Sequence, residues 1–262
     1  MASSLGDCTL LLGDSITQQA YDPSISGWAA SLTNAYINKL VVINHGLSGY
    51  NTDQALQLIP SILLSPSCTR IRILVVFFGA NDARLPDGDG PQQHVPLDKY
   101  CQNLKNIVAH ERVMEHEGVK VVLVTPPPID EHALLKQKMG TRKAEVTREY
   151  ASAVKCLAEE LRIPCLDIWG IFMREAGWKT GEMLMGSLSV EKNGLPKLLR
   201  DGLHPTSAGN KLVFTGLMDL IAAQWPGLLP EKLKPTFIPW WEFDVAHTGE
   251  GTSRFANIGS DV

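Results

Sequence analysis

Five short runs of apolar and β-branched residues recur along the chain. They lie at residues 8–12, 40–44, 71–78, 119–125 and 163–168. Each run is nearly continuous rather than alternating, which is typical of strands that are covered on both faces. The pattern therefore predicts five buried β-strands.

Segments with helical periodicity separate these runs. They lie at residues 28–38, 53–64, 97–116 and 143–161. In the third segment Tyr100, Leu104 and Ile107 recur every three or four positions, as on one face of an amphipathic helix. A last helix is expected to begin at Thr206 or Ser207, which are good N-cap residues, and to end near Gln224.

The alternation of strands and helices predicts the fold. Strands joined by helices form a parallel sheet through right-handed crossovers, with helices on both faces. We expect an α/β fold, in which a doubly wound, five-stranded parallel sheet of order 2-1-3-4-5 lies at the centre of a three-layer α/β/α sandwich. The 262 residues are enough for one large core, which we place at residues 1–225.

The chain changes character after Trp225. The segment that follows is rich in proline and tryptophan, with Pro226, Pro230, Pro235, Pro239, Trp240 and Trp241. Proline at this density opposes a further helix and predicts an extended tail over residues 226–262. Because exposed apolar groups promote association, we expect the tail to pack on the domain or on a second subunit of a homodimer.

Composition excludes several classes of protein. The formal charge is −4 and the basic residues are scattered, so no surface for nucleic acid is expected. Neither a membrane-spanning run of about 20 apolar residues nor a signal peptide is present, which indicates a cytoplasmic protein. Five cysteines without a C-x-x-C spacing favour reduced thiols over disulfides or a metal site.

Candidate chemistry lies directly after the first three predicted strands. Because strands 2, 1 and 3 are neighbours in the expected order, their three following loops meet at one edge of the sheet. Ser15 starts a helix there, where backbone N–H groups are unpaired and stabilise a negative oxygen. Three donors can be named: the backbone N–H groups of Ser15 and Gly49, and the side-chain amide of Asn81.

A serine nucleophile requires a base, and histidine suits that role. His204 lies directly before the last predicted helix, and Asp201 is close enough in sequence to orient its ring. Asp130 follows a predicted strand and Asp167 lies at the end of another, so either could orient the histidine instead. The spacing of three residues between Asp201 and His204 favours Asp201 as the partner of the histidine.

These residues fall in four blocks that resemble the SGNH, or GDSL, esterase family. The blocks are GDSI at 13–16, the glycine loop that ends at Gly49, GAND at 79–82 and DGLH at 201–204. The resemblance implies an SGNH hydrolase fold without a metal or cofactor. It also implies that Ser15 is the nucleophile, His204 the base and Asp201 its partner, with Gly49 and Asn81 as oxyanion donors.

Further segments resemble one group within that family, the isoamyl acetate-hydrolysing esterases. They are GYNT at 49–52, FFGANDA at 77–83, QHVPLDKY at 93–100 and TPPPID at 125–130. This resemblance implies a small acetate-type ester as substrate. The chain departs from that group at Asp53 and Gln54, where an arginine and a tryptophan are common.

Two rival hypotheses remain open. One keeps the chemistry but changes the substrate, to a lysophospholipid, a thioester or an O-acetylated carbohydrate. The other is a non-catalytic binding protein on the same fold, because a fold alone does not determine function.

Replacement of the candidate nucleophile tests this reading. Ser15→Ala is expected to abolish hydrolysis of p-nitrophenyl acetate and labelling by a fluorophosphonate, because it removes the hydroxyl expected to attack. The released nitrophenol gives the rate, and circular dichroism checks that the fold is kept. Undiminished hydrolysis by the variant would refute the assignment.

Overall fold

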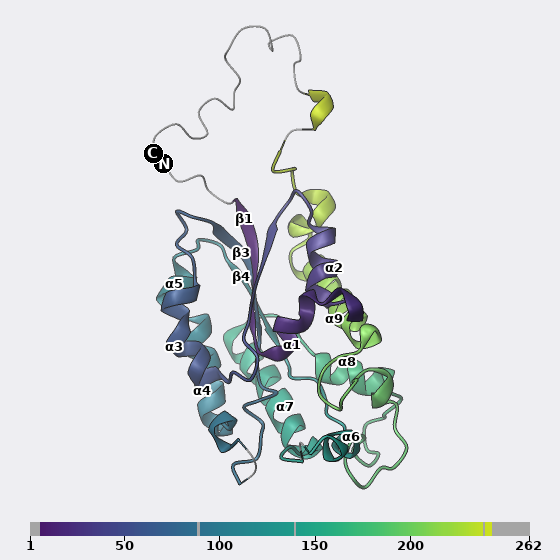
Figure 1. Cartoon of the computed structure of the whole chain (residues 1–262). Coiled ribbons are helices and arrows are strands. Elements are labelled where there is room, and N and C mark those ends of the chain that lie inside the picture. Colours follow the sequence, from purple (N-terminus) through teal and green to yellow (C-terminus); the bar gives the residue numbers. More distant parts are fainter. Residues whose placement is uncertain (1–5, 88–89, 139, 238, 243–262) are drawn as a thin grey trace, which may run out of the picture.

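The computed structural model describes residues 6–87, 90–138, 140–237 and 239–242, and a parallel sheet forms its centre (Figure 1). The described strands are β1 (Asp7–Gly13), β2 (Val41–Gly46), β3 (Arg70–Phe77), β4 (Lys120–Val124) and β5 (Cys165–Leu166). Their order is β2-β1-β3-β4-β5, and every neighbouring pair is parallel. The predicted fold class and strand order are confirmed.

Helices cover both faces of this sheet (Figure 1). One face carries α3 (Thr52–Ile62), α4 (Leu97–Val108), α5 (Glu111–Met114) and α7 (Ala144–Leu161). The other face carries α2 (Trp28–Ala35), α8 (Ile168–Glu175) and α9 (Ser207–Gln224). Two short helices, α1 (Ser15–Gln18) and α6 (Glu131–Lys136), lie near the edge where the strands end.

The core is divided by the sheet into two apolar layers. Side chains of a strand alternate between its faces, so Leu11 and Val75 enter one layer while Leu10 and Leu74 enter the other. All four are buried. This explains why the strands read as continuous apolar runs in the sequence.

Some element boundaries differ from the prediction. The helix expected at 97–116 is divided into α4 and α5, because the His110 side chain accepts a hydrogen bond from Arg112 N and caps a new helix. The last strand is only two residues long. Asp167 follows it and caps α8 by accepting from Gly170 N, so the chain turns away from the sheet at once.

The start of the predicted tail packs against the end of α2. Residues Pro226–Leu228 and Pro230–Lys232 form 3₁₀ turns rather than an extended chain, because proline fits the first position of a helical turn. Tyr36 Oη donates to Leu228 O (2.9 Å), and Thr236 N donates to Asn38 O (2.7 Å). The tail is therefore joined to the domain at its beginning.

Further along, Trp240 and Trp241 contact each other edge to face and are 79% and 67% exposed. Residues 243–262, which the prediction includes in the tail, lie outside the described residues. Packing of the tail on a second subunit stays a prediction.

The described residues are also expected to lack membrane spans, disulfides and metal sites. No helix there combines the length and apolar character needed to cross a membrane. All five cysteines are described, and none of them forms a disulfide. Within the same residues, no group of three or more His, Cys, Asp or Glu side chains is arranged to hold a metal ion.

Candidate active site

The junction of β1 and α1 places Ser15 at the carboxyl edge of the sheet. β1 ends at Gly13, and Asp14 caps α1 by accepting a hydrogen bond from Ile16 N (2.9 Å). Ser15 is the first residue of the helix and is 7% exposed. Its hydroxyl oxygen lies 2.9 Å from His204 Nε2, although the two residues are 189 positions apart in sequence.

A tight turn before α9 holds His204. Arg200 N donates to His204 O (2.9 Å), which closes the turn. Gly202 at its tip has a φ of +89°, and a Cβ there would lie 2.7 Å from Asp130 O. Only glycine accepts both the left-handed backbone and the close approach, so this turn requires glycine at position 202.

Asp201 uses both carboxylate oxygens within this turn. Oδ1 accepts the backbone N–H groups of Leu203 (2.9 Å) and His204 (2.7 Å). Oδ2 lies 2.7 Å from His204 Nδ1. Burial alone would raise the pKa of Asp201, but these hydrogen bonds and the neighbouring His204 hold it well below its usual range.

The ionised state of Asp201 determines the tautomer of the histidine. A carboxylate can only accept, so the ring proton lies on Nδ1 and Nε2 carries a lone pair. The hydroxyl of Ser15 then donates to Nε2. This arrangement gives the serine proton an acceptor and is suited to nucleophilic attack.

The other two candidate carboxylates are engaged elsewhere. Asp130 caps α6 by accepting from His132 N (3.1 Å). Asp167 caps α8 and pairs with Lys155 (2.8 Å). Of the three carboxylates considered from sequence, Asp201 is the one that contacts His204.

The loop after β2 presents the backbone of Gly49. Its φ of +82° lies in the left-handed region, which glycine adopts without strain. Gln93 Nε2 donates to Gly49 O (2.7 Å) and holds the loop in place. In the described part of the chain, the N–H groups of Ser15 and Gly49 meet no hydrogen-bond acceptor, so both remain available to a ligand oxygen.

The side chain of Asn81, in the loop after β3, has a defined orientation. Its Oδ1 accepts from Arg142 Nη2 (3.0 Å), and its Nδ2 donates to Tyr50 O (2.9 Å). Arginine only donates and a carbonyl only accepts, so the oxygen and nitrogen cannot be exchanged. One hydrogen of Nδ2 is used by Tyr50 and the second is free to donate.

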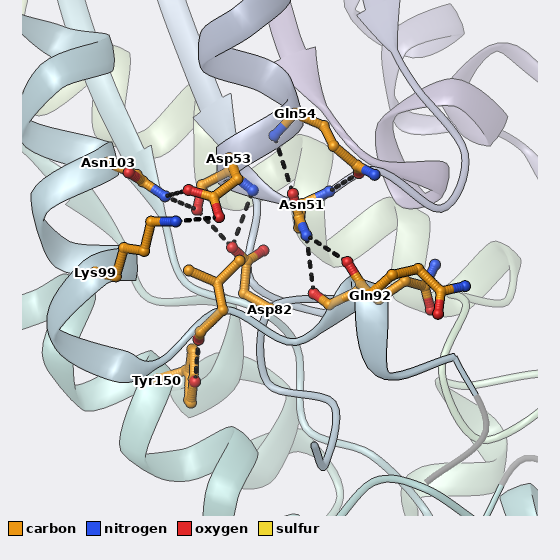
Figure 2. Close-up of polar contacts among 11 residues, drawn as sticks. Asn51, Asp53, Gln54, Asp82, Gln92, Lys99, Asn103 and Tyr150 are labelled. Atoms are coloured by element: carbon orange, nitrogen blue, oxygen red, sulfur yellow. Dashed lines mark hydrogen bonds and ion pairs between the residues drawn. The ribbon is translucent and has the colours of Figure 1, made fainter. Parts of the chain in front are cut away.

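Asp82 joins the loop after β3 to α3, in the polar network that Figure 2 shows. Its Oδ1 accepts from the backbone N–H (2.9 Å) and the hydroxyl (2.6 Å) of Thr52. Burial raises the pKa of Asp82 to about 7, although the Thr52 hydrogen bonds lower it; nearby Asp14 raises it further. Burial also raises the pKa of Asp14, to about 6. Because its hydrogen bonds go to Thr52, Asp82 holds the loop after β3 against α3 and does not contact His204.

Three residues that touch the site were missed from sequence: Tyr50, Gln93 and Arg142. Tyr50 and Gln93 lie in segments that were noted for their resemblance, but nothing in those segments indicates a hydrogen bond. Arg142 stands alone in a stretch without a motif. Each acts through contacts between distant parts of the chain, which a pattern of neighbouring residues does not encode.

The chain has clear relatives among known protein families. Residues 11–212 match the GDSL-like lipase/acylhydrolase family. The human isoamyl acetate-hydrolyzing esterase 1 homolog is 32% identical over 243 residues, which are 90% of this chain and 87% of that protein. A GDSL esterase/lipase of Arabidopsis thaliana is 34% identical over 234 residues, or 86% of this chain and 88% of that protein.

Solved structures share the fold at lower sequence identity. A lipase/acylhydrolase from Enterococcus faecalis has a TM-score of 0.60 at 22% identity and covers 88% of this chain and 100% of its own. A catalytic mutant of an acetylxylan esterase from Geobacillus stearothermophilus has a TM-score of 0.60 at 20% identity, over 86% of this chain and 98% of its own. At these identities, the similarity to both structures shows a shared fold only.

The raised pKa of Asp82 predicts a change in how stability depends on pH. Folded Asp82 binds its proton more tightly than the unfolded chain, so its stabilising effect is complete below about pH 4 and is lost as pH rises through about 7. Relative to Asp82→Asn, the wild type should lose unfolding free energy across this range, by at most about 1.4 kcal/mol per pH unit.

Urea denaturation of both proteins at several pH values between 4 and 8 measures this difference. Asp219→Asn, at an exposed position on α9, is the matched control and should follow the wild type. Parallel curves for wild type and Asp82→Asn would contradict the raised pKa.

Proposed function

The chain belongs to the GDSL-like lipase/acylhydrolase family and is a carboxylic ester hydrolase, and on this basis we propose that it hydrolyses small acetate-type esters through an acyl-enzyme on Ser15. The observation that carries the proposal is the hydrogen-bonded chain from Asp201 through His204 to Ser15, with distances of 2.7 and 2.9 Å. A serine is activated as a nucleophile by such a chain.

The first step is attack of Ser15 Oγ on the ester carbonyl carbon. His204 Nε2 takes the hydroxyl proton as the new carbon–oxygen bond forms, because its lone pair already faces the hydroxyl. The ring then carries a positive charge. Asp201 stabilises that charge through Nδ1 and keeps the ring in the productive orientation.

The carbonyl oxygen becomes an oxyanion during this attack. The unpaired N–H groups of Ser15 and Gly49, and the second Nδ2 hydrogen of Asn81, are the donors proposed to bind it. They belong to the loops after three adjacent strands. Donors already fixed in position cost no reorganisation during reaction, and each contributes about a hundred- to a thousandfold in rate.

The intermediate collapses when the alcohol leaves with the proton from His204. Ser15 then carries the acyl group as an ester. A water molecule repeats the attack, with His204 as general base, and releases the carboxylic acid and free Ser15. Bonds and protons balance across the cycle, so no further reactant is needed beyond ester and water.

The preference for a small acyl group is supported by the relatives. The human relative is named as a homolog of an isoamyl acetate-hydrolyzing esterase, and the alignment with it covers 90% of this chain. The segments at 49–52 and 77–83, which resemble that group, also surround the proposed oxyanion donors Gly49 and Asn81.

Replacement of Asp201 tests the hydrogen-bonded chain. In Asp201→Asn the amide can donate to Nδ1 and favour the wrong histidine tautomer, so kcat should fall by about 10³- to 10⁴-fold. Initial rates with p-nitrophenyl acetate measure the loss, and Asp219→Asn is the matched control. Wild-type kcat in Asp201→Asn would contradict the proposed role.

An ester series tests the acyl preference. The value of kcat/KM should decrease from p-nitrophenyl acetate through butyrate to octanoate, by at least about tenfold overall, because a pocket built for acetate excludes longer chains. Isoamyl acetate with product acid titration gives the rate on a natural-type alcohol. An increase with chain length would instead indicate a lipase or lysophospholipase.

A further inference from the structure

Arg142 is a buried cation next to the proposed site. The residue is 3% exposed, and burial lowers the pKa of its guanidinium to about 10; the like charge of Arg84 lowers it too, while Asp14 and Asp201 raise it. Burying a charge is costly unless the group is hydrogen-bonded. The hydrogen bonds that stabilise the buried guanidinium of Arg142 therefore indicate what the residue does.

The guanidinium contacts the loop after β3 at two points. Nε donates to Ala80 O (3.1 Å), and Nη2 donates to Asn81 Oδ1 (3.0 Å). These two donors belong to one rigid plane, so the backbone of residue 80 and the side chain of residue 81 are held together. The other terminal nitrogen, Nη1, is buried and has no hydrogen-bond partner among the described residues.

The backbone on both sides of Arg142 is fixed. On one side, Thr141 O accepts from Leu85 N (2.8 Å). On the other, the two carboxylate oxygens of buried Glu131 accept from Ala144 N (2.8 Å) and Lys143 Nζ (2.9 Å). The segment at 141–144 therefore crosses the loop after β3 and is attached to it and to the start of α6.

We propose that Arg142 is a positioning residue of the oxyanion hole, which holds the Asn81 amide with its oxygen turned away and its second Nδ2 hydrogen available to the substrate oxyanion. The inference rests on the proposed function. Without Arg142, Oδ1 loses its partner and only the hydrogen bond to Tyr50 O restrains the amide, so the second Nδ2 hydrogen faces the oxyanion for a smaller part of the time. The effect is largest where the negative charge is largest, which is in the transition state.

This role predicts a particular kinetic signature. Asn81→Ala removes the donor and should lower kcat about a hundredfold. Arg142→Met should lower kcat about tenfold, because the donor is present but correctly turned for only part of the time. In both variants KM should stay within about threefold of the wild type, since the interaction is made in the transition state.

A double-mutant cycle tests whether Arg142 acts through Asn81. Adding Arg142→Met to Asn81→Ala should cause no further loss of kcat, because there is no amide left to orient. Arg142→Lys keeps the charge but reaches only one of the two oxygens, so its kcat should lie between those of the wild type and Arg142→Met.

Arg148→Met is the matched control. Arg148 is exposed on α7, near Arg142 in sequence, and should tolerate the change without loss of kcat. Thermal unfolding by circular dichroism reports whether each variant is folded. If Arg142→Met does not fold, the same cycle with Arg142→Lys decides the question.

Two results would overturn the proposal: an unchanged kcat in the folded Arg142 variant, or the same further loss in the Asn81→Ala background as in the wild type. The second result would mean that Arg142 acts independently of Asn81, for example through its electrostatic interaction with Asp201. Failure of the proposed function is separate, because it would appear as absent Ser15-dependent hydrolysis in the wild type.

Discussion

The position of β1 between β2 and β3 is the constraint on which the site depends. All three strands are parallel and end at the same level, since Gly13 is paired with Gly46 on one side and with Phe77 on the other. Their following loops therefore start side by side. This brings the Ser15 amide, the Gly49 amide and the Asn81 side chain to one edge, although Ser15 and Asn81 are more than sixty positions apart in the sequence.

Buried and half-buried polar contacts then hold each loop in place. Gln93 donates to the Gly49 carbonyl, Arg142 donates to Asn81, and Asp82 accepts from Thr52. A polar group left unpaired in such a place costs free energy, so the loops cannot move without losing these contacts. The proposed donors are consequently held in place before an ester binds, which is the condition for electrostatic stabilisation of an oxyanion.

The histidine side of the site is built by a different route. The contacts between Asp201 and His204 span three residues, and the glycine between them permits the turn. The turn is attached to the domain at the start of α6, where Asp130 N donates to Gly202 O (2.9 Å). The adjacent Glu131 holds the segment that carries Arg142. The turn that carries His204 and the segment that carries Arg142 are therefore both attached to the start of α6.

The sequence by itself determined the fold class and the family, because these follow from periodicity and from four local blocks. The strand order was an expectation for the doubly wound fold class, since periodicity does not specify it. The sequence also indicated Ser15, His204 and Asp201, because a strand-to-helix turn and a three-residue spacing are local features. The short β5, the division between α4 and α5, and the rejection of Asp130 and Asp167 as partners of His204 came only from the tertiary structure. So did Tyr50, Gln93 and Arg142, since a hydrogen bond between distant segments depends on the packing of the whole chain rather than on neighbouring residues.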